Sequence, residues 1–448
     1  MTAEATNIPA PKRRSLYQLD ARTRRRNAAE TRFRAYGVAA IAFGMIALAV
    51  LLWSILGQGL SAFTQTRIAM DVTLDAAVLD KSGKRDPVEL AKATTLAYGK
   101  ILDQALIKQA TDKGLMPEGL SAKDAAGILS KEAPAQLRRM VLDNPALIGT
   151  TVQIEALANG RIDGFLKGRV TMESAQLDSN VTPGQLVLAQ NLKDAGLLAK
   201  SFNFDFITAP DASEVRPEAA GLGVAILGSL YMMMIVLVLA LPIGVAASIY
   251  LEEFAAKNWF TDLIEVNIAN LAAVPSIVYG ILGLAVFINF AGMPQSSPLV
   301  GGLVLTLMTL PTIIIATRAS LKAVPPSIKD AALGIGASKT QTVFHHVLPL
   351  AMPGIMTGTI IGMAHALGET APLLLIGMVA FVRDYPAAPP EGFLDPAAAL
   401  PVQVYNFTRR ADPAFLERAS GAIIVLLVFL ALMNVAAILL RRKFERRW

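Results

Sequence analysis

The chain has 448 residues, of which 54% are apolar and 17% are charged, and its mean hydropathy is +0.49. Soluble domains carry about a quarter charged residues, so this composition argues against a cytosolic enzyme and for several membrane spans. Because the sequence has no cysteine and three histidines, it excludes disulfides and thiolate sites and disfavours a zinc enzyme. We therefore expect no metal and no other cofactor.

The chain begins with a basic tail, residues 1–35, that ends in an arginine cluster directly before the first apolar run. Six stretches without lysine or arginine then have the length of roughly 20 residues that crossing a bilayer core requires. These predicted spans run from Tyr36 to Leu56, Gly221 to Tyr250, Ile268 to Phe290, Pro298 to Ala316, Met352 to Val382 and Ser420 to Leu440. The turn-rich segment Gly292–Ser296 separates the third span from the fourth, so we expect these two to form a hairpin.

Lysine and arginine are unevenly divided between the two sides of these spans. Nine lie in residues 1–35, one in 251–265, four in 317–350 and five in 441–448, whereas the short loops on the other side hold four. The positive-inside rule places the richer side in the cytoplasm. Six crossings then leave both termini in the cytoplasm.

Residues 57–218 have the composition of a soluble α+β domain, which we expect to fold on the periplasmic side between the first two spans. Arg67–Leu74 and Ser201–Thr208 alternate apolar and polar residues and are predicted to be strands. Helix-like spacing covers Pro87–Ala110, Ser121–Leu129 and Ala133–Leu142. Within the second of these, the residues at 121 and 124 form a plausible capping pair.

The loop from Thr317 to Leu350 holds the most informative motif. A Pro-Pro pair ends the fourth span, and Ser327 is placed to cap a new helix with Asp330 three residues on. Small residues that allow close approach of another backbone follow at Ala331, Ala332, Gly334 and Gly336. We expect a short helix that lies on the surface of a partner, after which Pro349 opens the fifth span.

This pattern resembles the coupling loop of type I ABC importer permeases. It consists of an acidic residue and two alanines, then a glycine, and ten residues later a segment ending in Leu-Pro, here Asp330-Ala331-Ala332, Gly336 and His346-Val347-Leu348-Pro349. Asp330 replaces the usual glutamate and His346 the usual isoleucine. The resemblance implies that Asp330, Ala331, Ala332 and Gly336 belong to a helix that couples the permease to an ATPase.

Further segments resemble the PstA family, the permease subunits of phosphate ABC importers. They are Gly228–Tyr231, Ala240–Ala247, Tyr250–Glu253, Asn270–Gly280 and Ala366–Leu374. The similarity covers Phe202–Trp448, and the N-terminal part looks like a longer variant with an extra domain after the first span. The resemblance implies a polytopic α-helical protein of the cell inner membrane, with six transmembrane helices and a permease core at residues 219–448.

Residues Gly334–Thr340 look like a phosphate-binding P-loop but do not fit one. Ser338 occupies the place of the glycine before Lys339, and no predicted strand precedes the loop. We therefore expect that this chain is not an enzyme and that ATP is hydrolysed on a partner subunit.

Glu369 is the one carboxylate inside a predicted span. Charges held in the membrane are costly, usually face a cavity or a partner, and mark transport pathways. His365, one helical turn earlier, is within pairing reach, and Gly368 and Pro372 should loosen the helix around the glutamate. The alternative is that Glu369 only bonds a neighbouring helix.

We assign Glu369, His365, Thr370 and Arg318 to the substrate pathway. Arg318, at the cytoplasmic end of the fourth span, offers a positive charge to an anion, or serves only as a positive-inside anchor. In the PstA family an arginine commonly occupies the position of His365, so this chain departs from the pattern there.

The resemblance implies one permease subunit of an ATP-driven phosphate importer. Its implied partners are a homologous permease, a dimer of ATP-binding subunits and a periplasmic phosphate-binding protein, without nucleic acid. Two alternatives stay open. One is a permease of the same architecture for sulfate, molybdate or another oxyanion. The other is a membrane receptor with a periplasmic sensing domain, although the longest internal cytoplasmic loop, Thr317–Leu350, has 34 residues and no output domain.

Overall fold

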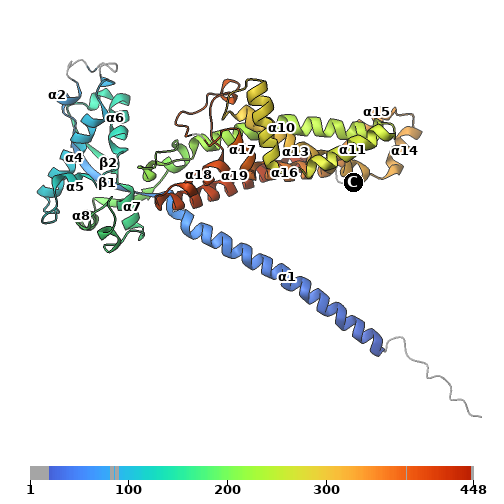
Figure 1. Cartoon of the computed structure of the whole chain (residues 1–448), viewed down its shortest axis with the longest axis horizontal. Coiled ribbons are helices and arrows are strands. Elements are labelled where there is room, and N and C mark those ends of the chain that lie inside the picture. Colours follow the sequence, from blue (N-terminus) through green and yellow to red (C-terminus); the bar gives the residue numbers. More distant parts are fainter. Residues whose placement is uncertain (1–19, 81–84, 86–89, 380, 445–448) are drawn as a thin grey trace, which may run out of the picture. The chain divides into compact units, whose positions relative to one another are not determined.

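A computed structural model describes residues 20–80, 85, 90–379 and 381–444, so the predicted basic tail lies outside the described residues up to residue 19. The chain divides into two compact units, residues 1–55 and 56–448 (Figure 1). The first consists mainly of α1 (Ala21–Gly59), in which every residue from Ala21 to Ser54 is exposed. This helix has no buried face within its unit, as expected of a helix whose apolar side chains meet lipid or another subunit.

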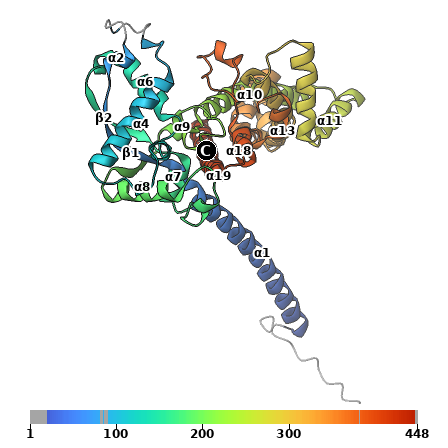
Figure 2. The same cartoon turned by 60° about the vertical axis from the view of Figure 1, so that its left-hand side comes forward.

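Residues 60–208 form an α+β module around a three-stranded antiparallel sheet of order β2-β1-β3 (Figure 2). The strands are β1 (Thr64–Thr73), β2 (Thr151–Leu157) and β3 (Leu198–Phe202). Ile68, Met70 and Val72 of the central strand are fully buried, because alternate side chains of a strand share one face. The helices of the module are α2 (Ala76–Leu79), α4 (Thr95–Asp112), α5 (Ala122–Ala126), α6 (Ala133–Asp143), α7 (Gly160–Leu166), α8 (Pro183–Asp194) and α9 (Asp205–Thr208).

Most predicted elements of the module are confirmed, and one is half wrong. The first strand and the helices predicted at Ser121–Leu129 and Ala133–Leu142 are present, and Ser121 Oγ accepts from the amide of Asp124 at 3.1 Å as the capping pair requires. The helix predicted at Pro87–Ala110 is present as α4 from Thr95, and residues 87–89 of the prediction lie outside the described residues. The strand predicted for Ser201–Thr208 ends at Phe202. Asn203 Oδ1 accepts from the amide of Phe206 at 3.1 Å and turns the chain into α9.

The second half of the chain is helical. Its helices are α10 (Gly223–Ile249), α11 (Trp259–Ala272), α12 (Ser276–Leu282), α13 (Pro298–Lys322), α14 (Pro326–Gly334), α15 (Lys339–Gln341), α16 (Leu348–Gly368), α17 (Ala371–Leu375), α18 (Leu400–Arg409) and α19 (Ala414–Phe444). Among the described residues of the whole chain, five helices are long and apolar enough to cross a membrane, or six if the bent pair α11 and α12 counts as one span. The turn predicted between the third and fourth spans lies between Phe290 and Pro298 and is confirmed.

Helix α13 lies at the centre of the helical half and packs against α10 and α16 (Figures 1 and 2). The contact with α16 is close because glycines replace larger side chains there. A Cβ atom on Gly358 would lie 2.3 Å from Ala316 Cβ, and one on Gly354 would lie 2.3 Å from Ser320 Oγ. These glycines are four residues apart, the spacing that lets two membrane helices approach along one face.

Three helical segments differ in extent from the spans predicted there. The third span is not one helix, because α11 and the helix that begins at Ser276 are bent by 104° at the break before Pro275. The helical segment of the fifth predicted span, Met352–Val382, begins earlier, at Lys339, since Ser338 and Gln341 form a capping box, and it ends at Gly368. The sixth begins at Ala414 rather than at Ser420 and therefore contains charged residues.

These charged residues of α19 are buried against the α+β module. Lys167 Nζ lies 2.7 Å from Asp163 Oδ2, 2.8 Å from Glu417 Oε1 and 2.7 Å from the carbonyl oxygen of Thr64. Arg169 Nη2 lies 2.5 Å from Glu417 Oε2. We call Asp163, Lys167, Arg169 and Glu417 the junction network. It joins the module to the last long helix of the chain, where each charge has a partner of opposite sign.

Candidate functional site

The helix that carries His365 ends beside Glu369. Helix α16 stops at Gly368, Glu369 has an extended backbone (φ −78°, ψ 127°), and α17 starts two residues later. The helix is thus interrupted between Gly368 and Pro372, the two residues that were expected to loosen it. The predicted pairing is present, since Glu369 Oε1 lies 3.1 Å from His365 Nε2. Thr370 is half-buried at the start of α17.

A second helix break, which sequence reasoning missed, lies beside the first. Helix α12 starts after Pro275 and packs against α17, where a Cβ on Gly280 would lie 2.7 Å from Pro372 Cα. A Cβ on Gly283 would lie 3.2 Å from Ile376 Cγ2, so the two segments run in the same direction and begin at the same end. Pro275 directly precedes α12, and Pro372 follows the break at Glu369. These prolines are the features of the sequence from which both breaks could have been predicted.

The surface that holds the Glu369 and His365 pair is open in the single chain. The His365 side chain is 60% exposed and that of Glu369 is 20% exposed. Ile361, one turn before His365 on the same helix, is also 60% exposed. The exposed face of α16 thus presents an ionisable pair beside apolar surface, which is an arrangement that a second subunit can enclose.

Arg318 does not lie beside this pair. Its Nη2 is 2.5 Å from Glu265 Oε1 and its Nε is 3.4 Å from Glu252 Oε2, so two carboxylates already balance its charge. Arg318 lies between Ala316 and Ser320, the positions that face Gly358 and Gly354 of α16. Glu369 is eleven residues beyond Gly358, or roughly 16 Å along a helix that rises about 1.5 Å per residue.

The predicted coupling helix forms, but not with the predicted cap. Helix α14 starts at Pro326, so Ser327 lies inside it and provides no capping hydrogen bond. Asp330 and Ala331 are exposed, and Ala332 is buried. Gly336 has φ +91°, a backbone conformation that favours glycine.

Apolar side chains at the end of this helix also point outward. Leu333 is 48% exposed and Ile335 is 83% exposed. On its other side the segment is held by Lys329, whose Nζ lies 2.5 Å from Glu253 Oε1. The segment is therefore anchored to the helical half and presents an apolar surface away from it.

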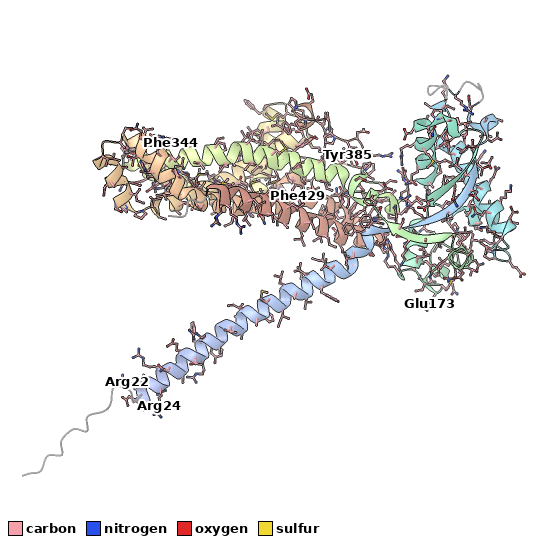
Figure 3. The ribbon with its side chains drawn as sticks, turned by 180° about the vertical axis from the view of Figure 1, so that it is seen from behind. Arg22, Arg24, Glu173, Phe344, Tyr385 and Phe429 are labelled. Atoms are coloured by element: carbon pink, nitrogen blue, oxygen red, sulfur yellow. The ribbon has the colours of Figure 1, made fainter. Side chains whose placement is uncertain are left out.

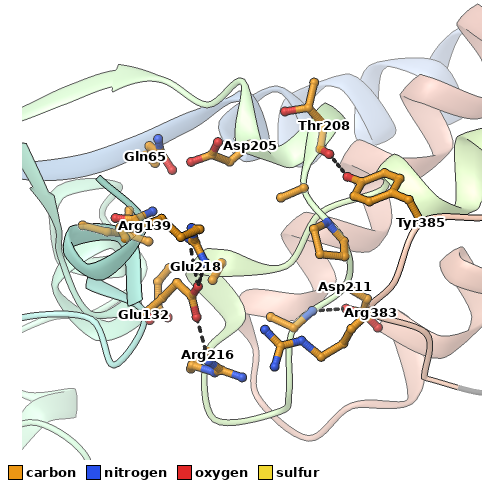
Figure 4. A pocket seen from close by; sticks show the side chains of 16 residues that line it. Gln65, Glu132, Arg139, Asp205, Thr208, Asp211, Arg216, Glu218, Arg383 and Tyr385 are labelled. Carbon is orange, nitrogen blue, oxygen red and sulfur yellow. Dashed lines mark hydrogen bonds and ion pairs between the residues drawn. The ribbon is translucent and has the colours of Figure 1, made fainter. Parts of the chain in front are cut away.

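A cavity of about 470 Å³ lies between the α+β module and the loops of the helical half (Figure 4). Two of its arginines, Arg139 and Arg216, share Glu132, at 3.2 and 2.6 Å. Burial raises the pKa of the Glu218 carboxyl, which accepts a hydrogen bond from Ser130 Oγ. Because both guanidinium groups already pair with a carboxylate, these two arginines do not make the cavity an anion site.

Four side chains mark the ends of the helical half and the start of α1. Tyr385, which donates a hydrogen bond to the carbonyl oxygen of Thr208, and Phe344, before α16, lie at different ends of the helical half (Figure 3). Arg22 and Arg24 lie in the first turn of α1 (Figure 3).

Two family models match the chain. Residues 20–176 match a model described as a domain of unknown function (DUF3333), and residues 227–448 match the binding-protein-dependent transport system inner membrane component. The predicted extra N-terminal domain thus has a family model of its own.

Similar proteins align with the helical half. The probable ABC transporter permease protein YqgI of Bacillus subtilis (strain 168) is 31% identical over 52% of this chain and 82% of its own length. The phosphate transport system permease protein PstA 1 of Mycobacterium tuberculosis (strain CDC 1551 / Oshkosh) is 32% identical over 52% and 75%, and PstA of Yersinia pestis is 29% identical over 49% and 73%. An inward-facing structure of the MetNI methionine ABC transporter aligns with a TM-score of 0.39 and 17% identity, over 50% of this chain and 95% of that chain.

The resemblance to PstA that the sequence segments indicated is confirmed by these relatives. The chain belongs to the family of binding-protein-dependent transport system inner membrane components and is a permease subunit of an ABC importer.

Proposed function

We propose that the chain forms, with a homologous permease, the translocation path of an ATP-driven importer of inorganic phosphate. The pair of adjacent helix breaks beside Glu369 carries this proposal. Non-helical backbone at membrane depth is tolerated where protein buries it or where it lines a water-filled path, and broken helices commonly form substrate sites in transporters. The names of the PstA relatives support phosphate as the substrate.

Glu369, His365 and Thr370 would line this path, and the homologous permease would close it over the exposed face of α16. Arg318 would have a different part from the one predicted. Its two carboxylate partners, Glu252 and Glu265, come from the ends of neighbouring helical segments, so it would hold the cytoplasmic ends of these helices together rather than bind the substrate.

The segment 327–349 would couple transport to ATP. Leu333 and Ile335 would insert into a groove of an ATP-binding subunit, with Asp330 at the rim of the contact. Closure of the dimer of ATP-binding subunits would then move α14, and with it the helices, so that the path opens first outward and then inward. This alternation requires that ATP and the loaded phosphate-binding protein each bind more tightly to one of the two states, outward-open or inward-open, than to the other.

The proposed topology follows the positive-inside rule. The chain would cross the inner membrane six times, with the bent α11–α12 pair as one crossing, both termini in the cytoplasm and the α+β module in the periplasm. A periplasmic phosphate-binding protein would deliver the substrate on the side of the module. The family assignment favours this reading over a membrane receptor.

Transport assays on the assembled complex test the pathway. We expect Glu369→Gln to abolish uptake of radiolabelled phosphate into vesicles while the complex still assembles, and Glu391→Gln, at an exposed loop position, to leave uptake unchanged. Normal uptake by the Glu369 variant would remove this residue from the path. Parallel assays with sulfate and molybdate separate phosphate from the alternative oxyanions, because transport of one of these without phosphate would contradict the proposed substrate.

A separate experiment tests the coupling segment. We expect Asp330→Lys combined with Gly336→Trp to reduce co-purification of the ATP-binding subunits and to uncouple their hydrolysis from the loaded binding protein. Normal co-purification with normal stimulated hydrolysis would contradict the docking role, whatever the substrate is.

A further inference from the structure

Three phenylalanines of the α+β module form an exposed apolar surface at one edge of its sheet. Phe202 is 50% exposed and Phe204 is 68% exposed, and their ring centroids are 4.6 Å apart. Phe63 lies 6.5 Å from Phe202 and continues this surface to the end of the segment that leaves α1. We call Phe63, Phe202 and Phe204 the aromatic edge. Exposed aromatic clusters of this kind on a folded domain indicate a contact surface.

The residues next to the aromatic edge pack beside the start of α10 and the third turn of α19. The amide of Leu222, directly before α10, donates to the carbonyl oxygen of Phe206 at 2.9 Å. A Cβ on Gly421 of α19 would lie 2.6 Å from Ala62 Cβ and 2.9 Å from the Phe206 ring. The residues on both sides of the aromatic edge are thus fixed against the start of α10 and the third turn of α19, two helices that are apolar enough to cross a membrane.

The same surface continues into the end of α1 and the short turn that follows it. Leu56 is 41% exposed and Leu60 is 58% exposed, and Phe63 follows Leu60 within one turn. The interfacial layer between hydrocarbon and water is about 5–8 Å thick on each side of a bilayer, which is about three to five residues of helix at about 1.5 Å per residue. The aromatic edge is therefore within reach of that layer.

We propose that the aromatic edge rests on the lipid bilayer, at the boundary between acyl chains and headgroups on the side of the α+β module. Phenylalanine and leucine side chains on the apolar face of segments that lie on a membrane are buried about 5–10 Å into this boundary. Lys200, which precedes Phe202 by two residues and so lies on the same face of β3, is exposed and reaches toward the headgroups. The module would then be supported at two places, by the junction network and by lipid, rather than tethered only by the chain.

Site-directed spin labelling tests this proposal, and the absence of native cysteine makes single labels specific. A nitroxide on Phe204→Cys is compared with one on Leu177→Cys, which is 92% exposed elsewhere on the module. Both are measured in the assembled transporter in nanodiscs of phosphatidylcholine and phosphatidylglycerol. We expect the ratio of collisions with oxygen to collisions with a water-soluble nickel chelate to be several-fold higher at position 204.

The two remaining outcomes would overturn the proposal. Equal ratios at the two positions would show that the aromatic edge lies in water. Protection of position 204 from both reagents would show that protein, such as the homologous permease or the binding protein, covers it. A label on Phe202→Cys repeats the measurement at a second position of the aromatic edge. The proposal can therefore still be tested if the Phe204→Cys variant does not assemble.

Discussion

Lys167→Met is the sharpest test of how the α+β module is joined to the helical half. The substitution keeps the apolar length of the side chain but removes the ammonium group that contacts Asp163, Glu417 and the carbonyl oxygen of Thr64. The side chains of Lys167, Asp163 and Glu417 are only 4–5% exposed. Water therefore cannot replace the lost partner without opening the contact.

The expected cost follows from this burial. Removing one partner of a buried ion pair destabilises proteins by about 3–5 kcal/mol. Arg169 Nη2, 2.5 Å from Glu417 Oε2 and 3.5 Å from Asp163 Oδ2, would remain as one cation between the two carboxylates. At about 1.36 kcal/mol for each factor of ten, the junction should open about 10²- to 10⁴-fold more often. Adding Glu417→Gln to Lys167→Met restores the balance of charge, so the double variant should recover part of the loss.

Hydrogen exchange of the full chain in detergent measures this opening at the amides of α7 and of the first turns of α19. Lys193→Met, at an exposed position in α8, is the matched control and should leave exchange unchanged. The reasoning would be refuted if Lys167→Met increased exchange less than tenfold. It would also be refuted if the double variant were no more protected than the single one.

Three further substitutions test other features. Gly358→Leu places a side chain where even a Cβ would lie 2.3 Å from Ala316 Cβ. Overpacking should lower the stability of the protein by about 1–3 kcal/mol, and with it the thermal unfolding midpoint in detergent. An unchanged midpoint would contradict the close contact of α13 and α16. Burial raises the pKa of Glu218, so ionising its carboxyl destabilises the folded state, and stability is lost as pH rises through the raised pKa. The thermal unfolding midpoint of Glu218→Gln should therefore exceed that of the native chain by an amount that grows between pH 4 and pH 8. A difference that stays constant with pH would contradict this. Gly336→Ala forces a side chain into φ +91°, at a cost of about 1–2 kcal/mol, and should weaken coupled ATP hydrolysis, whereas Gly334→Ala, with open space around it, should not.

The spacing of charged residues predicted the long helices because a segment that crosses a bilayer core must be long and free of charge. It predicted the start of a helix wrongly where a charged residue of that helix is paired inside the protein. The last span was predicted to begin at Ser420, after Glu417 and Arg418, whereas α19 begins before both. Their partners come from residues more than 150 positions away in the sequence, in the α+β module and its linker. Local composition contains no information on such contacts.

Helix breaks and turns set a second limit. The segment Ser201–Thr208 has the alternation of a strand, yet the side chain of Asn203 bonds the amide of Phe206 and the chain turns into α9. Pro275 and Pro372 each mark a break in an otherwise apolar run. Apolar length alone could not show that the two breaks lie together, because this depends on the packing of Gly280 against Pro372.

The partners of the glutamates in the helical half bear on our proposal that Glu369 lines the substrate path. Four described glutamates face a lysine or arginine, which stays charged throughout the physiological range; these are Glu252, Glu253, Glu265 and Glu417. Glu369 instead faces His365, whose ring is charged only when protonated. A fixed ion pair suits a contact that must hold two elements together, as at the junction network. The pair of His365 and Glu369 instead lies at a helix break on an open face. This position suits a path whose surroundings alternate between two states, and for this reason we propose a role in transport for Glu369 and structural support for the other four.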